Sequence, residues 1–234
     1  MSDDDLGAVN GRERCVARAL RAITPARFFC GARALSDPPL HSGESSLYQN
    51  VDPKVRRATA TGRELARELL SQFGVKTTAI LRGAGGAPAW PAGIQGSLAH
   101  DADFAVCIVG IGPNAHVGVD VEPAHALPSE IVDTVLVNAA EREAAGEDAI
   151  TARLIFCAKE AVYKICYPVE SIFYEFSDIL LLRRKHEQGQ LTTVGPVKLV
   201  FRTSTGRQAT VVAVREPRLL AVATADWIEP PYTR

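Results

Sequence analysis

Apolar and polar residues alternate along residues 117–123, VGVDVEP, and this period of two predicts a β-strand. The three valines then lie on one face, and Asp120 and Glu122 share the other. Two carboxylates held side by side repel each other unless a positive charge neutralises them. The pair is therefore either a set of oxygen ligands for a hard cation such as Mg²⁺ or two solvated charges on an exposed strand face.

Apolar positions three and four residues apart predict helices elsewhere in the chain. These helices cover about residues 11–22, 53–73, 129–137 and 150–166. Asp52 followed by Pro53 is a typical helix start, because Asp caps free amide groups and Pro fits the first turn.

Short apolar or alternating runs predict further strands near residues 26–34, 77–82, 104–110, 178–183, 197–203, 208–215 and 218–224. The glycine- and proline-rich segment 83–97 is expected to be neither helix nor central strand, and to let a ligand approach the backbone. Without a regular βαβ alternation, the order of elements favours an α+β fold with a partly antiparallel sheet.

A weak internal repeat aligns residues 56–70 with residues 153–167, so that Arg63 matches Glu160. With the chain break at Gly112-Pro113-Asn114, the repeat predicts two related halves, residues 1–114 and 115–234.

Composition narrows the class of protein. The chain has 234 residues, 47% of them hydrophobic, and a net charge of −1, which argues against bulk binding of nucleic acid. The amino terminus lacks the pattern of a secretory signal, and the longest apolar run, 104–111, is too short to span a membrane. Five scattered cysteines without a CxxC pair favour a reduced, cytoplasmic protein, with Cys107 and Cys157 buried.

The predicted helix 150–166 carries the segment FCAKEAVYK, residues 156–164. Glu160 and Lys164 are one turn apart and share a side with Phe156, Tyr163 and Tyr167. They form either an exposed ion pair or the rim of a site, in which Glu160 supplies a third carboxylate or acts as a general base.

Several groups suit the binding of phosphate. Ser97 and His100 are expected in a loop before an apolar strand, although a lone histidine is often structural. A row of arginines on the helix 53–73 and after it is either a solvated face or a phosphate site, namely Arg56, Arg57, Arg63, Arg67 and Arg82. Acids, arginines and a glycine-rich segment together predict a magnesium-bound, phosphate-rich small molecule. No P-loop or dinucleotide-binding motif is present.

Four blocks of the chain resemble the 4′-phosphopantetheinyl transferases, in particular the larger monomeric class that includes siderophore-associated enzymes. They are RRATATGRELAR (56–67), PAWPAGIQGSLAH (88–100), VGVDVEP (117–123) and FCAKEAVYK (156–164). The resemblance implies a pseudo-twofold α+β fold, each half a small sheet packed on a long helix. The N-terminal half would contact coenzyme A, and the C-terminal half would carry the metal ligands and the catalytic helix.

The resemblance also implies a reaction, in which the phosphopantetheine arm of coenzyme A moves to a serine of an apo acyl or peptidyl carrier protein and adenosine 3′,5′-bisphosphate leaves. It implies Mg²⁺, with Mn²⁺ as a substitute, and a cytoplasmic monomer that serves polyketide, non-ribosomal peptide or siderophore synthesis.

By motif, Asp120, Glu122 and Glu160 correspond to the metal ligands, Glu160 to the base, and Lys164 to an acid or charge stabiliser. The residues implied for coenzyme A are Arg56, Arg63, Arg82, Gly83, Ser97, His100, Asp120, Lys159 and Lys164. Where the family usually has Glu-Phe, this chain has Ala58-Thr59, so that Arg57 or Lys54 is an alternative to Arg56.

Two other functions are compatible with the residues. A metal-dependent nuclease or phosphodiesterase would use Asp120, Glu122, Glu160 and Lys164 and would not depend on coenzyme A. A non-enzymatic α+β interaction protein would bind neither Mg²⁺ nor coenzyme A.

Overall fold

The computed structural model describes residues 3–39, 41–76, 79–112, 114–184 and 195–227. A three-stranded sheet has the order β1-β5-β4, with bounds Phe29–Ala34, Phe104–Ile111 and Ile94–His100. A five-stranded sheet has the order β6-β10-β9-β8-β7, with bounds Val117–Glu122, Leu219–Thr224, Gln208–Val214, Val197–Thr203 and Ile179–Arg184. A small pair joins β2 (Leu81–Arg82) to β3 (Pro88–Ala89), and every strand pair in the described residues is antiparallel.

The α-helices are α1 (Asp3–Ile23), α2 (Pro53–Ser71), α3 (Ser129–Val135), α4 (Ala139–Ala145) and α5 (Ala149–Glu170), and the short 3₁₀ helices are η1 (Ser42–Tyr48), η2 (Ala84–Gly86) and η3 (Phe176–Asp178). The α+β class is confirmed. The predicted start of α2 is also confirmed, because the Asp52 side chain accepts a hydrogen bond from the Lys54 amide and Pro53 opens the helix.

The two sheets share a topology. In the first half, β1 is followed by α2, and the later strands β4 and β5 return so that β5 pairs with β1. In the second half, β6 is followed by α5, and β9 and β10 return so that β10 pairs with β6. The segments β1-α2-β4-β5 and β6-α5-β9-β10 therefore correspond, which supports the internal repeat at the level of topology. The predicted boundary at residue 114 lies in the β5–β6 connection.

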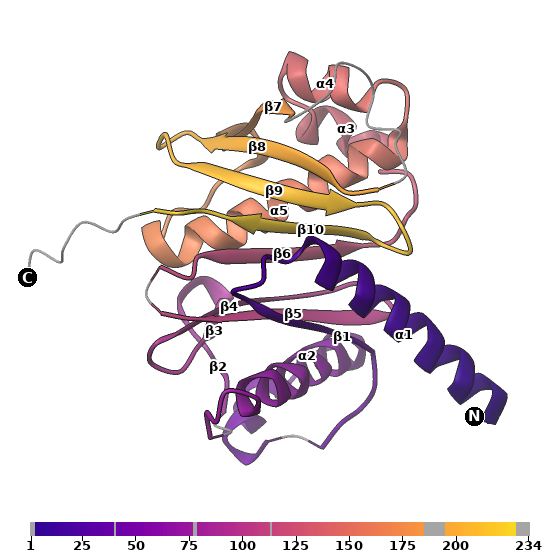
Figure 1. Cartoon of the computed structure of the whole chain (residues 1–234), viewed down its shortest axis with the longest axis vertical. Helices are drawn as coiled ribbons and strands as arrows, with labels where there is room; N and C mark the ends of the chain where they lie inside the picture. The colour runs from indigo at the N-terminus through magenta and orange to yellow at the C-terminus, as the bar shows by residue number, and fades with distance from the viewer. Residues whose placement is uncertain (1–2, 40, 77–78, 113, 185–194, 228–234) are drawn as a thin grey trace, which may run out of the picture.

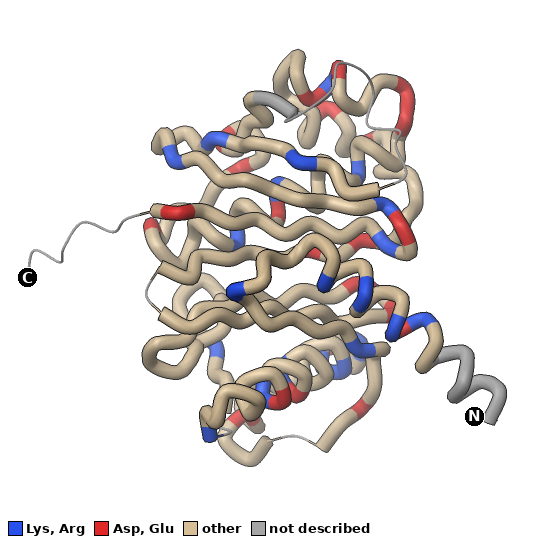
Figure 2. The backbone as a smooth tube through the Cα atoms, in the orientation of Figure 1, with Lys and Arg blue, Asp and Glu red and all other residues tan. Residues whose placement is uncertain are grey.

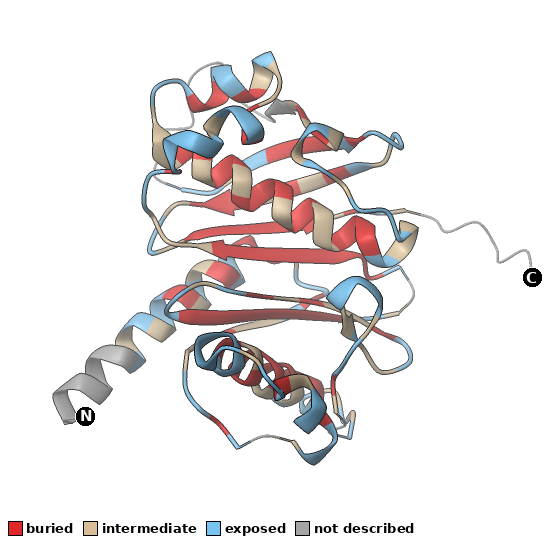
Figure 3. Cartoon of the chain, turned by 180° about the vertical axis from the view of Figure 1, so that it is seen from behind, coloured by how far each residue is buried: buried red, intermediate tan, exposed pale blue. Residues whose placement is uncertain are grey.

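The two halves are joined by a helix on one face of the sheets and by a strand contact between them. Val16, Leu20 and Ile23 of α1 belong to a buried cluster that takes residues from β1, β5, β6 and β10, so that α1 covers both sheets (Figure 1). The long helices α2 and α5 each cover one sheet, and the view from behind shows α5 with its buried side against the strands (Figure 3). Charged positions are absent from β5 and β10, as the tan strands in Figure 2 show.

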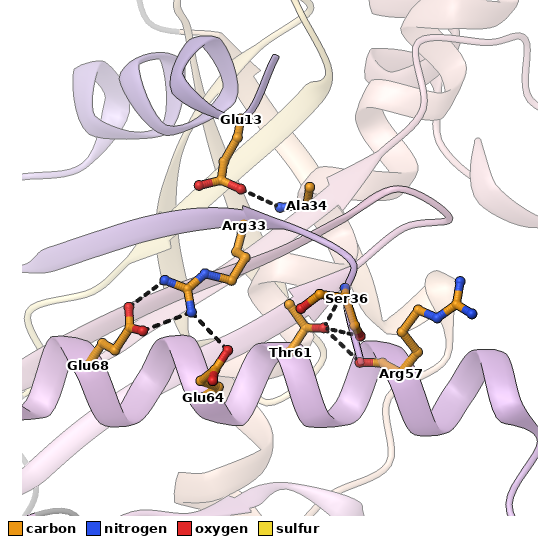
Figure 4. A network of polar contacts seen from close by, with 8 residues as sticks. All are labelled: Glu13, Arg33, Ala34, Ser36, Arg57, Thr61, Glu64 and Glu68. Carbon is orange, nitrogen blue, oxygen red and sulfur yellow. Dashed lines mark hydrogen bonds and ion pairs between the residues drawn. The ribbon is translucent and has the colours of Figure 1, made fainter. Parts of the chain in front are cut away.

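A polar network ties α1, β1 and α2 together in the first half (Figure 4). Arg33 on β1 forms ion pairs with Glu64 and Glu68 of α2, at 2.9 and 2.5 Å. Glu13 of α1 accepts a hydrogen bond from the Ala34 amide, and the Thr61 hydroxyl accepts one from the Ser36 amide. Because Arg33 serves two carboxylates at once, it fixes the position of α2 against the sheet.

Some expectations about elements were wrong. Ser97 and His100 lie in strand β4 instead of a loop before the apolar strand. Segment 83–97 contains no central strand, as predicted, since β4 is an edge strand where Gly96 lets the Trp90 ring lie close, but it does include the short 3₁₀ helix η2. The short helix α4 was missed. Its start depends on a reciprocal capping interaction between Asn138 and Glu141 that fits a segment without a strong apolar stripe. Within the described residues, no helix is both long enough and apolar enough to cross a bilayer.

The backbone of β6 lies very close to the backbone of α5 at Gly118. A Cβ atom on Gly118 would lie 2.0 Å from the Ala161 carbonyl oxygen and 3.1 Å from the Ile165 amide nitrogen. Both neighbours are helix backbone, which cannot turn away as a flexible side chain can. The glycine therefore determines how closely α5 lies on the strand that carries Asp120 and Glu122.

We expect Gly118→Ala to lower the free energy of unfolding by about 3 kcal/mol or more, because α5 must move away from β6. Gly11→Ala is the matched control, since a Cβ on Gly11 in α1 meets no atom within 4 Å. Alanine suits a helix interior better than glycine by roughly 0.5–1 kcal/mol, so this variant should be as stable as the parent or slightly more stable. Equal urea denaturation midpoints for the two variants would show that the α5–β6 approach does not limit stability.

Candidate functional site

Strand β6 places its valines and its acids on opposite faces, as the alternating sequence predicts. The valines belong to the buried cluster beneath α1. Asp120 and Glu122 face α5, where Lys164 and Arg153 contact them. Gly118, two residues before Asp120, lies on the same face at the point where the helix touches the strand. The site is therefore built between β6 and α5, at the side of the C-terminal sheet that adjoins β4.

Asp120 is buried and paired. Its Oδ1 lies 2.6 Å from Lys164 Nζ, which also donates to the Val119 carbonyl at 3.2 Å. Its Oδ2 is buried and has no hydrogen-bond partner in the described part of the chain. Burial opposes the charge of Lys164, but the carboxylates of Asp120 and Glu160 raise the pKa of this lysine and keep it protonated. The interpretation of Asp120 as a solvated surface charge is wrong.

The other two acids are influenced by the same charge. Burial, together with repulsion from Asp120, raises the pKa of Glu122 to about 7, while Arg153 at 3.3 Å opposes the shift. Burial and Asp120 also raise the pKa of Glu160, and Lys164 opposes this shift. Glu122 and Glu160 are therefore held where a negative charge is unfavourable and a nearby cation would stabilise it.

The described residues contain no group of three or more His, Cys, Asp or Glu side chains arranged so that it could hold a metal ion. Asp120, Glu122 and Glu160 are thus near each other without forming a closed coordination shell. In this structure Lys164 and Arg153 neutralise the two acids of β6. The oxygen chemistry of these carboxylates suits a hard divalent cation, and Asp120 Oδ2 has no hydrogen-bond partner in the described part of the chain, but in this structure the three side chains are not arranged around one ion.

Strand β4 brings two predicted residues to the boundary between the halves. The Ser97 hydroxyl is buried and accepts a hydrogen bond from the Val119 amide at 3.0 Å, so that it joins β4 to β6. His100 lies at the end of β4 with part of its surface exposed. The protein atoms around the rest of the side chain displace water, and this partial desolvation, together with the charge of Lys164, lowers its pKa. The histidine therefore belongs electrostatically to the same cluster as the acids.

The predicted arginines occupy different environments. Arg63 is buried, and its Nε donates to the Ile80 carbonyl at 2.7 Å. Burial lowers its pKa, and the nearby positive charge of Arg82 contributes. Arg56 and Arg82 are exposed. The structure thus brings Arg63 and Arg82 together, whereas Arg56 lies on the first turns of α2 with its side chain in solvent.

A pocket of about 220 Å³ lies between the segment that follows Arg82 and the helix α5. The residues that line it come from both halves: Gly85, Gly86, Ala87, Pro88, Trp90, Gln95, Gly96, Ser97, Leu98, Tyr163, Lys164, Tyr167 and Pro168. Lys164, Tyr163 and Tyr167 line this pocket. Glu160 instead lines a separate pocket of about 100 Å³ with Tyr163 and Phe176, and the Phe156 ring packs on Phe176 at 5.4 Å. That these side chains form the rim of a functional site stays a prediction.

Lys159 requires a correction. Its side chain has no exposed surface, and its Nζ lies 2.9 Å from Glu141 Oε1 and donates to the carbonyls of Val135 and Phe176. Three partners in a buried network leave this ammonium group without access to a phosphate in the structure. The expected contact between Lys159 and coenzyme A is wrong here, because the lysine faces the core of the C-terminal half instead of the boundary between the halves.

Sequence reasoning also missed Arg153 as a partner of Glu122. A signal was present, because Arg153, Cys157 and Ala161 are spaced four residues apart and so share the side of α5 that lies on β6. Cys157 is buried as predicted, and its thiol donates to the Leu219 carbonyl.

Comparisons with known proteins identify the family that the sequence matches. A family model described as the 4′-phosphopantetheinyl transferase N-terminal domain matches residues 43–110, and one described as the 4′-phosphopantetheinyl transferase superfamily matches residues 116–222. The chain is 34% identical over 174 residues to 4′-phosphopantetheinyl transferase PptT of Mycobacterium tuberculosis, covering 70% of this chain and 76% of that protein. It is 35% identical over 146 residues to 4′-phosphopantetheinyl transferase Npt of Nocardia iowensis, covering 61% and 65%. It is 33% identical over 141 residues to 4′-phosphopantetheinyl transferase Svp of Streptomyces mobaraensis, covering 58% and 57%.

We expect Lys159→Ala to lower the free energy of unfolding by about 3–5 kcal/mol, because it leaves Glu141 buried without its counter-charge. Unfolding in urea measures this loss. The affinity of the folded variant for coenzyme A should equal that of the parent, whereas the loss of a phosphate contact would lower it. If Lys159→Ala unfolds at the same urea concentration as the parent, Lys159 is again a candidate for binding coenzyme A.

Glu122 predicts a pH dependence of stability in the absence of divalent cations. Its pKa in the folded protein, about 7, lies above the ordinary value of 4.5, so the folded state holds an extra proton between these values. The contribution of this proton to the free energy of unfolding is complete below pH 4.5 and is lost as pH rises through 7. The whole loss is about 3 kcal/mol, since the two pKa values differ by about 2.5 and one pKa unit corresponds to about 1.4 kcal/mol, and about 2 kcal/mol of it falls between pH 5 and 7.5. Denaturation of the parent and of Glu122→Gln at pH 5 and 7.5 measures the difference. The variant should lose this part of the pH dependence, and identical pH profiles would contradict the shift.

Proposed function

The chain belongs to the 4′-phosphopantetheinyl transferase superfamily, and on this premise we propose that it transfers the phosphopantetheine arm of coenzyme A to a serine of an apo carrier protein. The observation that supports this most directly is the cluster at the boundary of the halves. Asp120, which is paired with Lys164 at 2.6 Å, lies near His100 of the other half. Glu122 and Glu160 lie near Asp120. Phosphoryl transfer needs this kind of site, since it relies on positioning and on neutralising the charge of the phosphates.

For the donor, we assign the N-terminal half to the nucleotide end of coenzyme A. Arg63 is buried, and its pKa is lowered first by burial and also by the nearby charge of Arg82, so these two arginines are the proposed partners of a phosphate. Arg56 is exposed nearby on the same helix as Arg63 and is free to turn toward a bound phosphate. We also assign His100, whose pKa responds to the charge of Lys164, and the backbone at Gly83, which follows Arg82, to contacts with coenzyme A.

For the metal, we propose that Asp120, Glu122 and Glu160 hold Mg²⁺, or Mn²⁺ in its place. When bound, the ion would neutralise charge on the pyrophosphate of coenzyme A. The free Asp120 Oδ2 and the raised pKa values of Glu122 and Glu160 support this choice of ligands. Asp120 is the firmest of the three, because it is the most deeply buried and affects both of the others.

For the chemical step, Glu160 is the proposed base and Lys164 the proposed stabiliser of the leaving group. A serine hydroxyl is a weak nucleophile, and a carboxylate of raised pKa is a better proton acceptor than an ordinary one. The serine oxygen bonds to phosphorus, its proton passes to Glu160, and the bond from phosphorus to adenosine 3′,5′-bisphosphate breaks. Lys164 remains protonated beside Asp120, so its positive charge is available to the departing phosphate.

The broader setting is also a proposal. We expect a cytoplasmic monomer that binds carrier proteins transiently and serves polyketide, non-ribosomal peptide or siderophore synthesis. The same acids would suit a nuclease, but no described feature favours one, and the assay below includes that alternative.

The direct test incubates the protein with coenzyme A, Mg²⁺ and a panel of apo carrier proteins, and measures the phosphopantetheine mass increase by mass spectrometry. Asp120→Ala, Glu160→Ala and Lys164→Ala should each reduce the rate by about 100-fold or more while the protein stays folded. Glu143→Ala, at an exposed position of α4, is the matched control and should retain the parent rate.

Near-normal turnover by folded Glu160→Ala would refute the proposed base. Cleavage of DNA with Mg²⁺ and without coenzyme A, lost in the same variants, would favour the nuclease and overturn the transferase assignment.

A further inference from the structure

An arginine of the C-terminal half holds a turn of the N-terminal half. Arg218 lies immediately before β10, and the turn of residues 101–103 joins β4 to β5. Arg218 Nε lies 3.4 Å from Asp101 Oδ2, and its Nη2 contacts Asp103. The guanidinium carbon also lies 5.2 Å from the centre of the Phe104 ring. One side chain therefore binds two carboxylates and an aromatic ring across the boundary of the halves.

The contact is mostly shielded from water. The Arg218 side chain is 16% exposed, and the Asp101 side chain is 2% exposed. Asp101 Oδ2 is buried and has no hydrogen-bond partner in the described part of the chain, so that Arg218 supplies its nearby positive charge. Removing one member of such a pair leaves an uncompensated buried charge, which is unfavourable, whereas an exposed ion pair can be lost with little effect.

The turn is rigid and leads directly to His100. Asp101 Oδ1 accepts hydrogen bonds from the amides of Asp103 and Phe104, at 2.7 and 2.8 Å. The Asp101 amide donates to the Phe104 carbonyl at 3.0 Å. Because these three hydrogen bonds close the turn, a displacement of the Asp101 carboxylate also displaces the backbone that carries His100.

The other end of the contact leads to the acids. Leu219, the residue after Arg218, pairs with Glu122 in the register of β10 and β6. Arg218 is thus one residue from the strand position opposite Glu122, and its partner Asp101 is one residue from His100. It connects the strand that supports the acids to the turn that supports the histidine.

We propose that Arg218 is a positioning residue for coenzyme A, which holds His100 at a fixed place relative to the acids of β6. This inference rests on the proposed function, in which His100 contacts a phosphate of coenzyme A. Arg218 acts through the turn and does not itself touch the ligand. Without it the turn shifts to solvate Asp101, and His100 moves with the turn.

The test measures the affinity for coenzyme A by calorimetry in a double-mutant cycle. Arg218→Met should weaken binding by about tenfold, because displacements of about 1 Å in a binding group have effects of this size or larger. His100→Ala should also weaken binding. In the His100→Ala background, Arg218→Met should cause less than about a twofold further loss, since coupled residues are not additive. Full multiplication of the two losses, or parent-like binding by Arg218→Met, would overturn the proposal.

Controls separate positioning from stability and from the proposed function. Arg207→Met removes another arginine of the same half, one that pairs with Glu170, and should not change the affinity for coenzyme A. If Arg218→Met does not fold, Asp103→Asn removes the more exposed carboxylate of the contact and should give a smaller loss that is likewise absent in the His100→Ala background. Failure of the parent to bind coenzyme A refutes the proposed function. Binding by the parent that is unaffected in Arg218→Met, or in Asp103→Asn if that variant is used, refutes only the positioning role.

Discussion

The close contact between α5 and β6 at Gly118 governs the geometry of the site. A side chain at this position would overlap the helix backbone at Ala161, so the strand can carry none there. The next two positions on the same face, Asp120 and Glu122, then lie directly beneath the helix. Small side chains on the facing side of α5, Ala161 and Cys157, keep the separation short. Because the helix lies so close to the strand, it shields the carboxylates of Asp120 and Glu122 from much of the solvent.

Electrostatics follows from this packing. Carboxylates under a helix lose solvation, so their pKa values rise unless positive charge is near. Lys164 and Arg153 supply part of that charge, but Glu122 still has a pKa of about 7 and Asp120 retains an oxygen without a hydrogen-bond partner. The positive charge of Lys164 and Arg153 therefore does not fully balance the negative charge of the carboxylates. A divalent cation with a bound pyrophosphate would change this balance, which gives a physical reason for a metal-dependent site on this strand.

The features that could be predicted from the sequence are those with local causes. The alternation of VGVDVE determined the faces of β6, and Asp52-Pro53 determined the start of α2, because backbone periodicity and capping act over a few residues. The role of Lys159 could not be read in this way. Its neighbour Glu160 reaches the site, yet a rotation of one residue on the helix turns Lys159 to a partner, Glu141, that only the tertiary fold brings near. Arg218 was missed for the same reason, since its partners are more than one hundred residues away.

The internal repeat explains how two similar halves provide opposite charges. The order β1-β5-β4 corresponds to β6-β10-β9, and α2 corresponds to α5, so Arg63 and Glu160 occupy related helical positions in the aligned segments. At these related positions the first half has a buried arginine and the second half has a partly buried glutamate. In the proposed function, the phosphates of coenzyme A would face the arginines of the first half and the metal ion would face the acids of the second. Two contacts between the halves, Ser97 with Val119 and Arg218 with Asp101, hold the two proposed binding regions at a fixed separation.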